Sequence, residues 1–214
     1  FRTVAGSAVT LICCSFFGYL VSKQEMYFRK LIYRFVIITM YVSGGLIPTY
    51  LVMRAYGLRN TLLVYILPGA VSAYVILIKT FIEQLPPSLE EAAKMEGAGI
   101  FICYTKIVLP LSKPILATIA LFAMVGQWNS WFDTHIYMTR PEYYPLQYIL
   151  YNYLQEAQRT ASAMADGLEA EGVRMTPNTV RMTITAISTI PIMLVYPFMQ
   201  RYFVKGIMLG AVKG

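Results

Sequence analysis

Residues 85–110 read LPPSLEEAAKMEGAGIFICYTKIVLP and separate two long apolar segments of the chain. Ser88 and, three residues later, Glu91 have the spacing of a capping box, which predicts that a helix begins at this point. Gly97 predicts the end of that helix, because glycine readily adopts the left-handed conformation common at helix C-termini. A second short segment over 100–107 leads back into apolar sequence. The stretch is therefore predicted to be a compact helix–turn–helix.

One face of the first predicted helix carries small side chains. Leu89, Ala92, Ala93 and Glu96 recur at the spacing of a single helical face. Because the two alanines are small, a partner surface could approach this face closely. An amphipathic loop lying on lipid headgroups would show the same properties, so these residues alone leave both interpretations open.

The composition indicates a membrane protein. Hydrophobic residues make up 57% of the 214 residues and charged residues only 14%, whereas soluble domains have about 45–50% apolar and about 25% charged residues. A membrane span needs about 20 apolar residues. Five such runs lie near Val4–Val21, Leu31–Met53, Thr61–Ile82, Ile107–Gln127 and Val180–Phe203. The predicted fold class is an all-α, polytopic membrane helical bundle that forms one domain over residues 1–214.

The charged residues argue against two other classes of membrane protein. Those within the spans lie near span ends, whereas an ion-coupled secondary transporter places ionisable groups at depth. An intramembrane enzyme needs a nucleophile with its base, or metal ligands, inside the spans. The single histidine, His135, lies in a loop, and the three cysteines have no metal-site spacing. We therefore predict no catalytic and no metal-binding residue.

The basic residues predict the orientation of the chain. Eleven of the 18 fall on the side that carries the 23–34 loop, the 79–113 loop and the C-terminal tail, and the positive-inside rule makes that side cytoplasmic. The loop over 83–106 is then cytoplasmic and the loop over 132–179 is external. Because the basic residues are scattered among the spans, they predict no nucleic-acid partner.

The cytoplasmic loop also resembles a known signature, that of binding-protein-dependent ABC importer permeases. The positions that match it in identity and spacing are Glu91, Ala92, Ala93, Gly97, Ile107, Leu109 and Pro110. Glu96 stands where many members have aspartate. Similar stretches continue along the chain at Ser43–Tyr50, Leu109–Pro114, Trp128–Phe132 and Gly206–Gly214. The chain is most similar to the maltose-importer-like class, especially its branch for complex oligosaccharides and uronic-acid sugars.

This resemblance implies a fold, a location and partners. ABC importer type I permeases usually have six spans, so we expect one further span before Phe1. They lie in the bacterial cytoplasmic (inner) membrane, surrounded by lipid, with a second permease subunit, two ATPase subunits and an extracytoplasmic sugar-binding protein. This chain has no phosphate-binding loop, so ATP and Mg would be bound by the partner ATPase and the chain would need no cofactor. Closure of the ATPases would act through the cytoplasmic loop to open the pathway outward.

The outer end of the fourth predicted span carries candidate sugar-pathway residues. Trp128, Asn129 and Trp131 could stack on or bind a sugar, although tryptophans also populate the membrane interface for other reasons. The sequence does not identify the sugar. The alternative function is a secondary transporter, or another polytopic membrane protein whose 83–110 loop only lies on the membrane surface.

Overall fold

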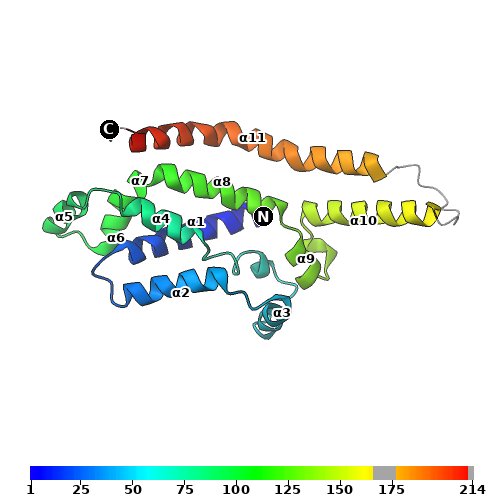
Figure 1. Cartoon of the computed structure of the whole chain (residues 1–214), viewed down its shortest axis with the longest axis horizontal. Coiled ribbons are helices and arrows are strands. Elements are labelled where there is room, and N and C mark those ends of the chain that lie inside the picture. The colour runs from blue at the N-terminus through cyan, green and yellow to red at the C-terminus, as the bar shows by residue number, and fades with distance from the viewer. Residues whose placement is uncertain (166–176, 212–214) are drawn as a thin grey trace.

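The computed structural model describes the backbone of residues 1–165 and 177–211 and the side chains of residues 1–162 and 178–197. Every regular element in these ranges is helical, and the elements form an elongated bundle (Figure 1). The predicted all-α class is therefore confirmed. Residues 166–176 of the predicted external loop, and Lys213 and Gly214 of the tail, lie outside the described residues.

Helix α1 (Arg2–Ser22) forms the centre of the bundle and contains the first predicted span. It packs against α4 (Tyr74–Ile82) and α8 (Lys113–Asn129). Gly18 allows this approach, because a Cβ at that position would lie 2.9 Å from Ile78 Cγ2 and 3.2 Å from a backbone carbonyl of α4. The absence of a side chain therefore sets the distance between α1 and α4.

We expect Gly18→Leu to lower the melting temperature of the detergent-solubilised protein, because a side chain forced between packed helices typically costs about 1–3 kcal/mol. The measurement is thermal unfolding followed by size-exclusion chromatography. Gly44→Leu is the control, since a Cβ there would meet only Pro48 Cβ, at the ordinary distance of 3.7 Å. Equal melting of the two variants would contradict the close packing of α1 and α4.

The second predicted span, Leu31–Met53, is not one helix. Helices α2 (Arg29–Tyr41) and α3 (Leu46–Ala55) meet at a bend of 118°. Gly45, at the bend, has a φ of 82°, in the left-handed region that other residues avoid. The predicted run is therefore a bent pair of helices, which is long and apolar enough for a span only when its two halves are counted together.

The third predicted span, Thr61–Ile82, crosses the bundle without forming a continuous helix. A 3-10 turn, η1 (Leu62–Tyr65), is followed by irregular backbone over 66–73 and then by α4. Pro68 and Gly69, in the irregular part, both disfavour helix. The segment nevertheless runs along α1, because Tyr65 lies against Arg2 at the N-terminal end of α1 and Ile78 against Gly18 near its C-terminal end.

The fourth predicted span begins later than expected. Helix α6 (Ile100–Ile102), the π-helical η2 (Cys103–Val108) and α7 (Leu109–Leu111) form one arm, which is bent by 80° from α8. The predicted start at Ile107 was wrong, because Pro114 has no N–H to donate to the carbonyl of Pro110 and the helix begins anew at Lys113.

The elements that follow α8 complete the bundle. Helices α9 (Phe132–Tyr137), η3 (Pro141–Tyr143) and α10 (Leu146–Ala165) follow α8. Helix α11 (Pro177–Ala211) contains the predicted last span and stays helical beyond it. Two described helical segments are single helices long and apolar enough to cross a membrane, Arg2–Ser22 and Asn178–Pro197; counting each bent pair as one span gives up to four.

The two ends of the bundle carry different elements. Figure 1 shows helix α5 (Ser88–Met95) and the C-terminal end of α11 at one end, and α3, α9 and α10 toward the other. The elements predicted to be cytoplasmic are therefore grouped at one end of the molecule.

Candidate functional site

Helix α5, in the predicted cytoplasmic loop, begins differently from the prediction. The backbone is already helical at Pro87, with φ −63° and ψ −26°. The Pro87 carbonyl accepts the N–H groups of Glu90 at 3.0 Å and Glu91 at 3.1 Å, and no side chain caps the helix. The predicted capping box was wrong, because Ser88 lies inside the first turn and not at the position before it.

The end of α5 confirms the prediction made from Gly97. Gly97 has a φ of 83°, and its N–H donates to the Lys94 carbonyl at 3.0 Å. The next N–H, of Ala98, donates to the Ala93 carbonyl at 2.9 Å. This pair of bonds is the Schellman motif, which requires the left-handed residue that only glycine supplies easily.

The residues of the predicted signature do not share one surface. Glu91, Ala92 and Glu96 are exposed on α5, whereas Leu109 packs against the core beside α1 and Ile107 is half-buried. The exposed helix is thus supported from behind by the second half of the signature. Exposed apolar side chains surround α5, at Leu89, Met95, Ile100, Phe101 and Ile102.

The second half of the loop is fixed by buried contacts with α1. Tyr104 and Val108 are buried in the same cluster as Tyr19 and Ile78. The Tyr104 hydroxyl is 2.7 Å from the hydroxyl of Ser15, in the middle of α1. The arm and α1 are therefore packed together through buried side chains.

Charged groups fasten α5 to the loop between α1 and α2. Glu90 forms an ion pair with Lys23 and accepts a hydrogen bond from the Tyr19 hydroxyl at 3.4 Å. Lys94 donates to Glu25 at 2.7 Å, and this bond holds the pKa of the exposed Glu25 carboxyl below its usual range. Sequence reasoning missed these pairs, because no local pattern connects residues so far apart in the chain.

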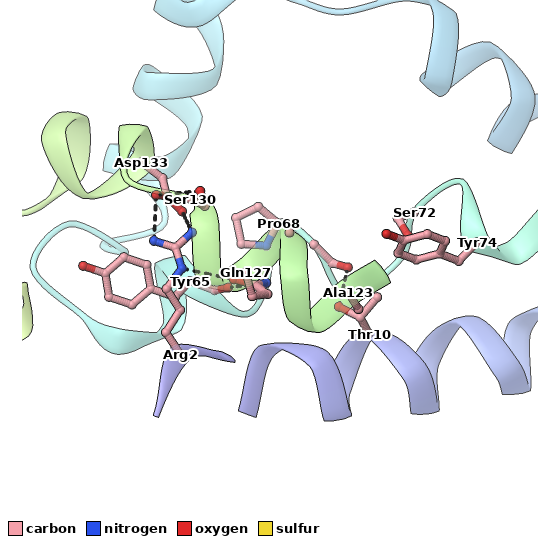
Figure 2. Close-up of a pocket in the computed structure, with 12 residues that line it drawn as sticks. Arg2, Thr10, Tyr65, Pro68, Ser72, Tyr74, Ala123, Gln127, Ser130 and Asp133 are labelled. Atoms are coloured by element: carbon pink, nitrogen blue, oxygen red, sulfur yellow. Dashed lines mark hydrogen bonds and ion pairs between the residues drawn. The ribbon is translucent and has the colours of Figure 1, made fainter. Parts of the chain in front are cut away.

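A cavity of about 380 Å³ lies between α1, the irregular 66–73 segment, α8 and the start of α9 (Figure 2). Its walls combine apolar surface with hydroxyl, amide and charged groups. The lining residues are Arg2, Thr10, Tyr65, Pro68, Gly69, Ser72, Tyr74, Ala123, Gly126, Gln127, Ser130 and Asp133.

Arg2 organises the end of this cavity that lies beside Asp133. Only 8% of Arg2 is exposed, and its two terminal nitrogens donate to Asp133 Oδ1 at 2.8 Å and Oδ2 at 2.5 Å. Its Nε donates to Gln127 Oε1 at 3.1 Å, and its guanidinium lies 4.6 Å from the centre of the Tyr65 ring. Sequence reasoning missed this cluster. In the sequence, Arg2 and Asp133 are only single charges beyond the ends of two different predicted spans.

The three predicted sugar-pathway residues contact other helices, and the structure does not join them in one site. Trp128 Nε1 donates to the Ser188 carbonyl of α11 at 3.1 Å. Trp131 stacks on Tyr151 of α10 with ring centres 3.9 Å apart, and Asn129 accepts a hydrogen bond from α10 at 3.5 Å. Of the three, only Trp128 also lines a second cavity, of about 450 Å³, which shares Arg2 and Gln127 with the first.

Comparison with known proteins gives consistent matches along the chain. The family described as the binding-protein-dependent transport system inner membrane component matches residues 15–209. The chain is 38% identical to the polygalacturonan/rhamnogalacturonan transport system permease protein YtcP of Bacillus subtilis (strain 168), over 100% of this chain and 74% of the relative. It is 39% identical to protein LplC of the same organism, over 100% of this chain and 72% of that protein.

A solved structure has the same arrangement of helices. It is the crystal structure of a bacterial ABC transporter involved in the import of the acidic polysaccharide alginate. The match has a TM-score of 0.74 and 29% sequence identity, and it covers 94% of this chain and 73% of the other.

Proposed function

This chain belongs to the family of inner membrane components of binding-protein-dependent transport systems, and from that premise we propose how it takes part in sugar import. It is a permease subunit of a sugar-transporting ABC importer and is not itself an enzyme. Membership of this family implies a binding protein and an ATPase as partners. It leaves the alternative, a secondary transporter or a loop that only lies on the membrane, without support.

The proposed coupling site is the face of α5. The observation that carries it is the exposure of Glu91, Ala92 and Glu96 on a short helix whose base is fixed by Gly97 and by the buried Tyr104. Because its base is fixed to the rest of the bundle, a helix held in this way would move together with the segments it contacts when the ATPase displaces it. We assign the residues of the signature, including Ala93, Ile107, Leu109 and Pro110, to docking on the ATPase or to supporting the docked face.

The proposed assembly contains two permease subunits, two ATPase subunits that bind ATP and Mg, and an extracytoplasmic sugar-binding protein. The chain forms one transmembrane domain, with a cytoplasmic coupling loop over 83–106 and an external loop over 132–179. The C-terminus is proposed to be cytoplasmic, since α5 and the C-terminal end of α11 lie at the same end of the molecule (Figure 1). Basic residues concentrate on that side, as bacterial inner-membrane topology requires.

The proposed cargo is an oligosaccharide, and galacturonan fragments are the first to test. The similarity to a polygalacturonan/rhamnogalacturonan permease and to an alginate importer supports this choice. Trp128, Asn129 and Trp131 remain predicted pathway residues. Trp128 is the best placed of them, because it lines a cavity.

Glu91→Lys tests the coupling site. We expect the variant to insert into the membrane normally but to lose sugar uptake and co-purification with the ATPase, because a positive charge replaces the negative one on the docking face. Uptake and ATP hydrolysis are measured in proteoliposomes that contain the whole complex. Glu156→Lys, an equal charge change on an exposed residue of the external helix α10, should leave both unchanged. Normal uptake by Glu91→Lys would refute the assignment.

A further inference from the structure

We propose that the cavity between α1 and α8 is a sugar-binding subsite of this chain, which recognises the hydroxyl groups of one sugar ring and not a carboxylate. The proposal rests on the proposed function, sugar import, and assigns part of the recognition to this subunit. The residues that carry it are Thr10, Tyr74, Gly126 and Gln127, together with the irregular backbone of 66–73.

The irregular backbone is the first argument. Residues 66–73 lack helical structure although they lie beside the middle of α1, where the Gly69 carbonyl accepts the Thr10 hydroxyl at 2.9 Å. In a membrane protein, such backbone is tolerated only where protein buries it or where it lines a polar cavity. Interrupted helices of this kind mark binding sites in other membrane transporters.

Two backbone carbonyl oxygens at the interruption can each accept a further hydrogen bond. The carbonyls of Tyr65 and Gly69 each accept one hydrogen bond, from Gln127 at 3.2 Å and from Thr10 at 2.9 Å. A carbonyl oxygen has two lone pairs, so each of these carbonyls can accept a second donor. Sugar hydroxyls are donors and acceptors at once and match this surface.

The size and the free polar groups of the cavity are also suitable. Its volume of about 380 Å³ lies within the range of small-molecule sites, about 300–1,000 Å³. Tyr74 lines the cavity, and within the described part of the chain its hydroxyl forms no hydrogen bond. Gly126 also lines the cavity, and a Cβ added there would meet no atom within 4 Å. The cavity therefore offers both room and an unused polar group.

The charges of the cavity exclude a carboxylate as the recognised group. Four N–H groups of the Arg2 guanidinium are used: two donate to Asp133 and the others to Gln127 and Thr134. An incoming carboxylate would meet a neutralised cation and the negative charge of Asp133. A uronic-acid sugar would therefore bind here by its hydroxyl face, with its carboxylate directed elsewhere.

The test uses the complete transporter, with its binding protein, in proteoliposomes that are offered trigalacturonate or its methyl ester. Gly126→Leu should abolish uptake of both sugars, because the new side chain occupies the cavity. Helix α8 should stay folded, since leucine has a high helix propensity. Co-purification of all subunits and basal ATP hydrolysis should stay at the wild-type level. Uptake by Gly126→Leu at the wild-type rate would overturn the proposal, and so would loss of co-purification, which would place Gly126 at a subunit interface.

Tyr74→Phe provides an independent test that does not depend on filling the cavity. The variant loses only a hydroxyl without a partner, so the fold should be unaffected. The KM for uptake should rise about fivefold, the effect of one neutral hydrogen bond, and equally for the acid and the ester. Tyr56→Phe, at an exposed tyrosine outside the cavity, should not change the KM. An unchanged KM for Tyr74→Phe, or a rise confined to the acid, would refute the subsite.

These outcomes are distinct from failure of the proposed function. If the chain does not take part in sugar import, the wild-type complex will take up neither probe. If only the subsite is wrong, the wild-type complex will take up the probes, and Gly126→Leu and Tyr74→Phe will take them up at the wild-type rate.

Discussion

Gly97→Pro is expected to abolish sugar uptake while the protein still inserts into the membrane and the ATPase still hydrolyses ATP. Proline fixes φ near −65° and has no N–H, whereas Gly97 has a φ of 83° and donates to the Lys94 carbonyl. The Schellman motif at the end of α5 cannot form, at a cost of about 3 kcal/mol or more for a misplaced proline. Helix α5 then no longer points in a fixed direction, and movement of the ATPase is not transmitted to the spans.

A graded series at the same position separates backbone conformation from side-chain size. Space is open around Gly97, because an added Cβ would meet no atom within 4 Å. Gly97→Asn should therefore take up sugar at nearly the wild-type rate, because asparagine tolerates the left-handed conformation. Gly97→Ala should lose about 1 kcal/mol of folding stability, because alanine is strained in that conformation. Gly99→Ala is the matched control, because Gly99 is extended and also has open space. Equal uptake by the proline and asparagine variants would show that the direction of α5 does not matter.

Arg2→Met is expected to have the second large effect, on stability. It leaves the Asp133 carboxylate without its cation, and breaking a buried ion pair by removing one partner typically costs about 3–5 kcal/mol. The Asp133 side chain is 27% exposed, so water compensates in part and we expect a loss of about 2–3 kcal/mol. The measurement is the melting temperature of the purified complex in detergent.

The double variant Arg2→Met/Asp133→Leu shows whether the unpaired charge causes the loss. Replacing both partners of a buried pair by apolar residues is often neutral, so the double variant should recover most of the stability that Arg2→Met loses. If it melts as low as Arg2→Met, the arginine stabilises the protein through its contacts with Gln127 and Tyr65 instead.

The fold class and the end of α5 at Gly97 could be predicted from the sequence because their signals are local. A long apolar run predicts a membrane span whatever its neighbours are. Gly97 ends a helix because glycine readily adopts the left-handed conformation. The boundaries failed where two local signals competed. At Ser88 the preceding proline already has helical geometry, so the helix starts before the capping residue. At Gly45 and at Pro114 the apolar composition continues, but the backbone turns.

The cavity beside Arg2 could not be predicted because its parts are distant in sequence. Arg2 and Asp133 are 131 residues apart, and each in isolation resembles an ordinary charge at the end of a span. The interruption at Pro68 and Gly69 has a local cause, because both residues disfavour helix. Its meaning depends on the neighbouring Thr10 and Gln127, which only the packing of α1 and α8 brings to it. Trp128 and Trp131 stay predicted pathway residues, and their contacts with α11 and α10 could not be read from the sequence either.

Helix α1 is anchored at both of its ends, and this makes it a strut between the two sides of the membrane. Arg2 ties its outer end to Asp133, while Tyr19 joins its inner end to Glu90 of α5. At about 1.5 Å per residue, the 21 residues of α1 span about 30 Å without a proline to bend them. If α5 is the coupling site, a push on it would reach the wall of the cavity as a shift of the same rod. In the proposed assembly, one helix and its two anchors would then link the ATPase-docking loop to the proposed sugar subsite.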